Sequence, residues 1–243
     1  MLELMVTGFR IDAYCPEEVS VLALPQHRAN VLCTKFPGET HLVAPLLDAD
    51  PQQSFLFMLR DPRDVIVSRH GRAPERYWAN LGQWRRAWNE VRPRSHHERL
   101  MVVRYEALVR APDAVQTEIA ARLPFLESKA PFSHYHLHSR PSAQSLQAMR
   151  SVRPVAGDSV GAWRRNKSRV AGQLRIHGAI SQELIDLGYE PDDRWLAELE
   201  GVEPDLSPGF WPEQPSAEFA ARRRRQLSEE LPRYLSNLQI RHP

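Results

Sequence analysis

Residues 54–71 read SFLFMLRDPRDVIVSRHG and place a group of charged residues between two apolar runs. The first run, residues 54–59, shows no alternation of apolar and polar residues, which is typical of a strand covered on both faces. The charged residues then favour a helix start, because Asp61 suits the N-cap position and Pro62 suits the first helical position. We therefore predict a buried strand that leads directly into a helix reaching about Arg72.

Arg60 is the residue that this local pattern does not explain. It directly follows the buried run, and ligands of open α/β sheets bind at the carboxyl ends of the strands. Ser68 lies eight residues later, about two turns into the expected helix. An arginine and a hydroxyl in this arrangement form a phosphate clamp in one interpretation and a structural ion pair in the other. The spacing leaves both interpretations open.

Composition narrows the class of protein. A chain of 243 residues suits one α/β domain with decorations, and 32 basic against 30 acidic side chains give no reason to expect nucleic-acid binding. Cys15 and Cys33 are too few for a disulfide framework, which favours a cytoplasmic, reducing location. The sequence contains neither a run long enough to span a membrane nor a signal-peptide pattern at its start.

Strands and helices are expected to alternate along the chain. The pattern predicts strands over residues 29–36, 54–59 and 100–105, and helices over residues 40–47, 77–91, 113–123, 173–187 and 216–238. Such alternation favours a parallel sheet flanked by helices and joined by right-handed crossovers. We expect an α/β domain over residues 1–200, irregular over 130–161, and then a linker and a charged terminal helix over 201–243.

Three motifs, taken together and in order, resemble those of the sulfotransferases that use 3′-phosphoadenosine 5′-phosphosulfate (PAPS). They are LRDPRDVIVS at residues 59–68, VVRYEALVRAP at residues 102–112 and SVGAWRRNKS at residues 159–168. The resemblance covers roughly residues 30–190 and implies a P-loop NTPase-like parallel sheet, with PAPS as the sulfuryl donor and no metal.

The resemblance also implies roles for the residues of these motifs. Arg60 would hold the 3′-phosphate with Ser68 as a second donor, and Tyr105 would lie near the adenine. Gly161 would allow close backbone approach to the phosphate, and Trp163 would pack the closing loop or cover the base. Arg164 and Arg165 would add positive charge at this loop.

An upstream segment, TKFPGETHL at residues 34–42, is similar to the part of the family that supplies a lysine and often a catalytic base. Lys35 matches the lysine and would neutralise charge at the sulfuryl or 5′-phosphate oxygens. Pro37 stands where some members carry a histidine base, so Glu39 and His41 become the candidate substitutes. The other interpretation of His41 is an ordinary histidine on a helix surface.

One family element has no counterpart in this sequence. Members begin with a strand and a Ser-Gly-Thr turn that cradles the 5′-phosphosulfate at a helix N-terminus, and no such turn occurs here. Residues 1–19 are instead similar to the family segment that lies after that turn and its helix. We therefore expect either that the chain begins after the turn or that the 5′-phosphosulfate site is lost.

These observations predict a sulfotransferase that moves a sulfuryl group from PAPS to a hydroxyl or amine of a small-molecule or glycan acceptor. The alternative is a non-catalytic, degenerate sulfotransferase fold that binds the nucleotide or a partner. A nucleoside-phosphate kinase of the same general fold would need a glycine-rich loop with lysine and Ser/Thr, which is absent from the sequence.

Three further patterns each allow two interpretations. His134, His136 and His138 would share one face of an extended segment, as a metal site or as part of the acceptor site. Trp78, Trp84 and Trp88 would form either an acceptor wall or core. The run at residues 222–225, RRRR, is either a site for an anionic polymer or a solvated helix face.

Overall fold

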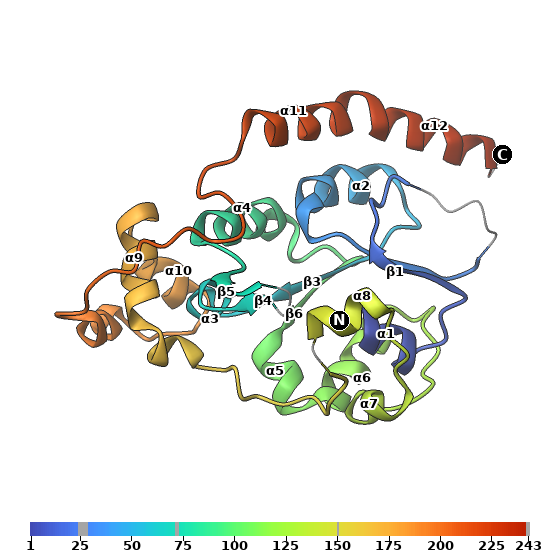
Figure 1. The fold of residues 1–243 in the computed structure, drawn as a ribbon. Coiled ribbons are helices and arrows are strands. Elements are labelled where there is room, and N and C mark those ends of the chain that lie inside the picture. The colour runs from blue at the N-terminus through green and yellow to red at the C-terminus, as the bar shows by residue number, and fades with distance from the viewer. Residues whose placement is uncertain (24–28, 71–72, 150, 242–243) are drawn as a thin grey trace. The chain divides into compact units, whose positions relative to one another are not determined.

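The computed structural model describes residues 1–23, 29–70, 73–149 and 151–241. Short strands and helices follow one another along the chain and give a mixed α/β architecture (Figure 1). The chain divides into two compact units, each made of separate segments: unit 1 contains residues 1–58, 87–156 and 215–243, and unit 2 contains residues 59–86 and 157–214. The division falls within β3 (Phe55–Leu59) and α4 (Leu81–Val91), so both units contain parts of these two elements.

Unit 1 holds most of the strands. Besides its parts of β3 and α4, this unit contains α1 (Leu2–Gly8), β1 (Ala13–Glu18), β2 (Leu32–Lys35), η1 (Pro37–Leu42), α2 (Val43–Ala49), η2 (Arg92–Arg94), β6 (Leu100–Arg104), α5 (Tyr105–Arg110), α6 (Pro112–Arg122), η3 (Phe132–His134), α7 (Tyr135–His138), α8 (Ala143–Met149), α11 (Ala217–Arg225), η6 (Gln226–Glu230) and α12 (Leu231–Arg241). β1 pairs with β2 in parallel, and β3 pairs with β6. In the β1–β2 register Tyr14 lies opposite Cys33, and neither Cys33 nor Cys15 forms a disulfide.

The largest core of unit 1 joins α1, β6, α5 and α6. Phe9 and Phe132 are both fully buried there and meet edge to face, with ring centroids 5.7 Å apart. Gly8 allows this contact, because a Cβ atom at Gly8 would lie 2.3 Å from the Phe132 ring. The N-terminal helix is therefore fixed by a close approach that tolerates no side chain at this position.

A second core of unit 1 lies under the C-terminal helix. Leu42 and Leu46 pack against Leu231 and Tyr234, and Figure 1 shows α11 and α12 running alongside α2. Between α11 and α12 the chain forms η6, one turn of π-helix over residues 226–230. The terminal helix expected over residues 216–238 is confirmed, and it is part of the packed structure.

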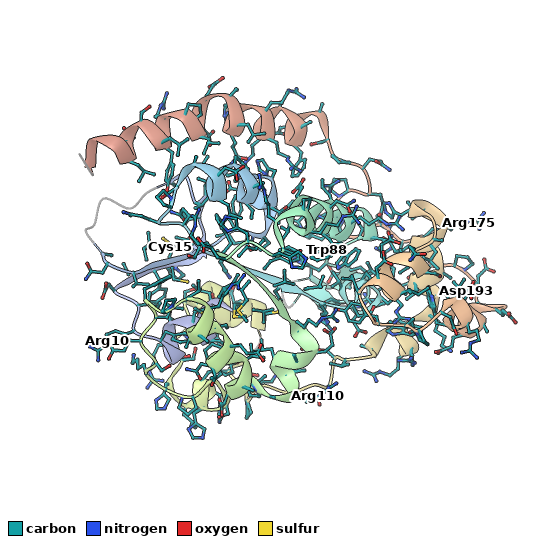
Figure 2. All side chains as sticks on the ribbon, turned by 180° about the vertical axis from the view of Figure 1, so that it is seen from behind. Arg10, Cys15, Trp88, Arg110, Arg175 and Asp193 are labelled. Atoms are coloured by element: carbon teal, nitrogen blue, oxygen red, sulfur yellow. The ribbon has the colours of Figure 1, made fainter. Side chains whose placement is uncertain are left out.

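Unit 2 consists of short elements around a buried centre. They are α3 (Pro62–Ile66), β4 (Arg69–His70), β5 (Ala73–Tyr77), η4 (Ala162–Arg165), α9 (Lys167–His177), α10 (Ser181–Asp186) and η5 (Asp193–Leu199). β4 and β5 pair antiparallel. Gly172 lets the irregular segment 201–216 lie directly on α9, because a Cβ atom there would meet the carbonyl oxygen of Asp205 at 2.0 Å. Exposed charged side chains, including Arg175 and Asp193, lie on the outside of this unit (Figure 2).

The helix after Pro62 is shorter than the sequence predicts. α3 ends at Ile66, and Ser68 lies beyond it and not two turns into a helix. The expected end at Arg72 lies outside the described residues. Residues 65–67, VIV, are all β-branched, and such side chains lose rotamer freedom in a helix and favour strands.

Two other helix predictions need correction. Tyr77 belongs to β5, and α4 begins only at Leu81, where Asn80 accepts the N–H of Gln83 at 2.9 Å as a cap. The helix expected over 173–187 is two helices, α9 and α10, separated at Gly178, which has a φ of 80°. At Gly178 a turn signal in the sequence outweighed the apolar spacing, whereas Tyr77 pairs with β4 as part of β5.

Candidate functional site

Arg60 directly follows the carboxyl end of β3, as the sequence predicts. Its side chain is 17% exposed, and its Nη2 donates a hydrogen bond to the carbonyl oxygen of Ser159 at 2.6 Å. The same nitrogen lies 4.0 Å from the Oδ2 of Asp64. Arg60 is thus held between α3 and residues 159–163, which we call the glycine–tryptophan loop.

Asp64 attaches this loop to the first turn of α3. Its carboxylate is 1% exposed and accepts the N–H of Gly161 at 2.8 Å and the N–H of Trp163 at 3.0 Å. Gly161 has a φ of 72°, in the left-handed region that favours glycine. Burial raises the pKa of the Asp64 carboxyl, while the two N–H bonds and the charge of Arg60 act in the opposite direction.

Trp163 is a packing residue of the loop, with only 1% of its surface exposed. The guanidinium of Arg63 lies 4.2 Å from the centroid of its ring and 4.9 Å from that of Trp195. Arg63 also pairs with Asp61 at 2.7 Å and with Glu190 at 2.6 Å. Burial lowers the pKa of Arg63, but the bonds to these two carboxylates outweigh it and raise the pKa overall.

Arg164 stands at the exposed edge of the same loop. Its guanidinium lies 4.5 Å from the Trp163 ring centroid, and its Nε lies 3.3 Å from a Glu198 oxygen. Lys167 pairs with the other oxygen of Glu198 at 3.2 Å. Arg164 supplies the positive charge that the sequence predicts at this loop, and its ion pair with Glu198 neutralises part of that charge.

Tyr105 lies at a strand end, as its motif predicts, whereas Ser68 lies beyond α3 and not two turns into a helix. The Ser68 N–H donates to the carbonyl of Val65 at 3.1 Å, and its own carbonyl accepts from the N–H of Trp78 at 2.8 Å. Tyr105 is the first residue of α5 and directly follows β6 in unit 1. Both side chains are half-buried.

Lys35 is the last residue of β2 in unit 1, at the carboxyl end of a strand that pairs with β1 in parallel. Its carbonyl accepts the N–H of Val19 at 3.2 Å, and its side chain is half-buried. The strand expected over residues 29–36 is present as β2, which begins at Leu32 and ends at this lysine.

Glu39 lies in η1, four residues after Lys35, and is a buried carboxylate with 5% of its surface exposed. It accepts the N–H of Val21 at 3.3 Å and a hydrogen bond from the side-chain amide of Gln226. The guanidinium of Arg222 lies 3.5 Å from the same carboxylate. Glu39 therefore joins the segment after β2 to the C-terminal helix.

Glu90 makes a second connection of this kind. Its carboxylate accepts the hydroxyl of Thr40 and pairs with Arg223. Elsewhere on the helix Arg225 pairs with Glu230 at 3.0 Å, so the four-arginine run is largely engaged with acidic neighbours. We call the contacts of residues 222–226 with residues 39–41 and Glu90 the C-terminal latch.

His41 lies under the C-terminal latch. Both of its ring nitrogens are buried, and neither has a hydrogen-bond partner among the described residues. Burial, followed by the charge of Arg223, lowers the pKa of His41 to about 4. The imidazole is consequently neutral at pH 7. His41 as a whole is half-buried, with both ring nitrogens buried, so it is not an ordinary exposed histidine on a helix surface.

The other patterns seen in the sequence have structural explanations. His134 ends η3, while His136 and His138 lie in α7, so these histidines are helical and do not share the face of an extended segment. Trp84 is 9% exposed and donates its indole N–H to the carbonyl of Arg60 at 3.2 Å. Trp88 is half-buried, and its ring centroid lies 6.0 Å from that of Phe57.

Two kinds of feature are missing from the described residues. Across these ranges the structure has no group of three or more His, Cys, Asp or Glu side chains suited to hold a metal. Nor does any helix in the same ranges combine the length and the apolar character that crossing a membrane requires.

Comparisons with known proteins bear on this arrangement. Residues 14–125 match the model of the sulfotransferase family. A protein-tyrosine sulfotransferase of Drosophila melanogaster is 25% identical over 202 residues, which cover 76% of this chain and 39% of that protein. Both findings support a sulfotransferase family.

The family match includes five of the site residues expected from the sequence: Lys35, His41, Arg60, Ser68 and Tyr105. The glycine–tryptophan loop lies outside the match and joins the site through Asp64. The chain spans 39% of the length of the Drosophila sulfotransferase, well under half. No role for Asp64 in the site was predicted from the sequence, because its partners lie almost 100 residues further along the chain.

Proposed function

We propose that this chain is a PAPS-dependent sulfotransferase that transfers a sulfuryl group to a hydroxyl or amine acceptor. The observation that carries the proposal is Arg60, which follows strand β3, is only partly exposed and is held in place by the glycine–tryptophan loop. A P-loop-like parallel sheet belongs to the same proposal, and the parallel β1–β2 pair supports it.

The donor groups of unit 2 suit a 3′-phosphate. Arg60 carries a permanent charge and planar donors that match phosphate oxygens, and we assign Ser68 as the second donor. The N–H groups of Gly161 and Trp163 are bonded to Asp64, so we do not assign them to the phosphate. In unit 1 we assign Tyr105 to the adenine end.

We assign the groups that act on the sulfuryl oxygens and on the acceptor's proton to residues of unit 1. PAPS, when bound, supplies the sulfuryl group and leaves as 3′-phosphoadenosine 5′-phosphate (PAP). Lys35 would neutralise negative charge on the sulfuryl or 5′-phosphate oxygens. We assign His41, which is neutral at pH 7, as the acceptor of the proton, although both ring nitrogens are buried and a pKa of about 4 makes it a weak base.

The acceptor class is proposed more broadly than the donor. The Drosophila relative is a protein-tyrosine sulfotransferase, so a tyrosine-containing peptide is a reasonable acceptor to add to the small molecules and glycans that the sequence suggests. All three present a hydroxyl group, which loses its proton as the new sulfur–oxygen bond forms.

Calorimetric binding of PAP tests the proposal. Arg60→Ala should weaken PAP binding by about 10- to 100-fold, since a hydrogen bond to a charged group contributes roughly 1.5–3 kcal/mol. Adenosine 5′-phosphate (AMP) lacks the 3′-phosphate, so its affinity should change little in the same variant. Arg194→Ala removes an exposed arginine that pairs with Asp192 and is the matched control. A folded wild-type chain that binds no PAP would contradict the proposal.

A non-catalytic nucleotide-binding module is the second candidate. The observation in its favour is His41, whose two ring nitrogens are buried under the C-terminal latch and out of contact with solvent. Transfer of radioactive sulfate from PAPS to a phenol, a tyrosine peptide or a glycan distinguishes the two candidates. Turnover that is abolished by Lys35→Ala supports the enzyme, whereas PAP binding without any turnover supports the module.

A further inference from the structure

Asp64 connects the two segments that the proposed function assigns to the 3′-phosphate. Its Oδ2 accepts the N–H of Gly161 and lies 4.0 Å from the Nη2 of Arg60, while its Oδ1 accepts the N–H of Trp163. The two oxygens therefore hold the loop at two points and approach the arginine at a third.

Arg60 also bonds to this loop, as a donor where Asp64 is an acceptor. Its Nη2 donates to the carbonyl of Ser159, two residues before the glycine. Asp64 in the first turn of α3 thus contacts the donors of this five-residue loop, and Arg60, just before the helix, contacts an acceptor of it. A side chain that is fixed at both ends loses little further freedom when it binds an anion, which is the basis of preorganised recognition.

We propose that Asp64 is a positioning residue that fixes Arg60 and the glycine–tryptophan loop in the arrangement that selects a 3′-phosphate. The inference rests on the proposed function and deepens it. Asp64 does not touch the phosphate in this role, because its own charge is negative and its oxygens are bonded to the loop. Its effect reaches the ligand through the geometry of Arg60.

Electrostatics alone predicts the opposite sign for a change at Asp64. Removing a negative charge 4.0 Å from Arg60 leaves a stronger net positive charge, which would tighten the binding of any phosphate. Loss of positioning instead releases the loop and lets Arg60 adopt other rotamers, which weakens binding of the 3′-phosphate specifically. The direction of the change therefore separates the two roles.

The experiment compares PAP and AMP binding to wild type and to Asp64→Asn by calorimetry at pH 7. Asparagine has the same shape but only one acceptor oxygen, so one of the two loop attachments is lost. We expect PAP affinity to fall at least 10-fold while AMP affinity changes less than about 2-fold. Asp61→Asn is the matched control, since Asp61 is a buried carboxylate of the same turn that bonds to Arg63.

Both variants should lower the thermal midpoint, so stability alone does not distinguish them. Only Asp64→Asn should change the ratio of PAP to AMP affinity. An unchanged ratio, tighter PAP binding, or an equal change in Asp61→Asn would overturn the role of Asp64 and leave the proposed function intact. Wild-type protein that binds no PAP would overturn both.

Gly161→Ala provides a second route if Asp64→Asn does not fold. An added Cβ atom strains the φ of 72° at the residue whose N–H bonds to Asp64, and its nearest neighbour is the flexible end of Arg164 at 3.3 Å. The loop should then lose its attachment from the opposite side, with the same fall in PAP affinity. A folded Gly161→Ala protein with wild-type preference for PAP would contradict the proposal.

Discussion

The surroundings of Arg60 in unit 2 and those of His41 in unit 1 use buried polar groups in contrasting ways. Around Arg60 the buried groups are bonded to each other: Arg63 to two carboxylates, and Asp64 to two backbone N–H groups. Around His41 the ring nitrogens have no hydrogen-bond partner in the described part of the chain, and burial comes from the C-terminal latch. The first region is organised by its own bonds, whereas the second depends on a helix near the end of the chain.

The largest effect we expect tests the first half of this comparison. Arg63→Ala leaves the carboxylates of Asp61 and Glu190 without their shared cation and removes the guanidinium that lies over the rings of Trp163 and Trp195. Removing one partner of a buried ion pair typically costs about 3–5 kcal/mol. Urea unfolding measures the loss.

Arg194→Ala is the control for that measurement. Its pair with Asp192 is exposed, with 84% of the arginine side chain in contact with solvent, so the urea midpoint should hardly move. If both arginine variants unfold at the wild-type midpoint, the region around Arg60 is not organised by its ion pairs.

A smaller effect tests the C-terminal latch. Gln226→Ala removes the amide that donates to Glu39, and a buried acceptor that loses its donor costs about 1–3 kcal/mol. Thermal unfolding should show a lower midpoint, and Ser236→Ala is the control because that hydroxyl bonds only locally, to the carbonyl of Pro232. Equal midpoints for wild type and Gln226→Ala would mean that the latch contributes nothing to stability.

The third expected effect is a dependence of stability on pH. The pKa of His41 falls from 6.5 to about 4 on folding, so the unfolded chain binds more protons than the folded chain between these values. Above pH 6.5 His41 is neutral in both states, and its titration does not reduce the free energy of unfolding. As the pH falls from 6.5 toward 4, the unfolded chain takes up the proton first, and the free energy of unfolding decreases. His41→Gln should flatten the rise in the free energy of unfolding across this window.

His138→Gln is the matched control for the pH measurement, because His138 is exposed and its substitution should leave the slope unchanged. The comparison is made on the slope and not on the absolute stability, since glutamine in a buried site has a cost of its own at every pH. A slope that survives in His41→Gln assigns the pH dependence to other groups.

The sequence predicted the strand-to-helix junction at Arg60 because the signals there are local. Asp61 caps α3 through the N–H of Arg63, and Pro62 takes the first helical position, as their residue types indicate. The strand that contains Lys35 was predictable for the same reason. Local signals operate within one turn and do not depend on the rest of the chain.

Other features were not predictable, because they depend on residues far apart. The bonds of Asp64 to the loop and of Glu39 to Gln226 span 97 and 187 residues. Tyr77 was assigned to a helix because it continues the apolar spacing of α4, yet it is the last residue of β5, where pairing with β4 decides the conformation. Tertiary contacts overrule local spacing in such places.

The π-helical turn at residues 226–230 has a geometric consequence for the C-terminal helix. An α-helix rotates by about 100° for each residue, and a π turn accommodates one extra residue within the same helix. Here the turn separates the polar face of α11, with Arg222 and Arg223, from the apolar face of α12, with Leu231 and Tyr234. Deleting one residue from the turn would rotate one of these faces toward solvent. The number of residues in the helix therefore decides which side chains face the interior, as much as their types do.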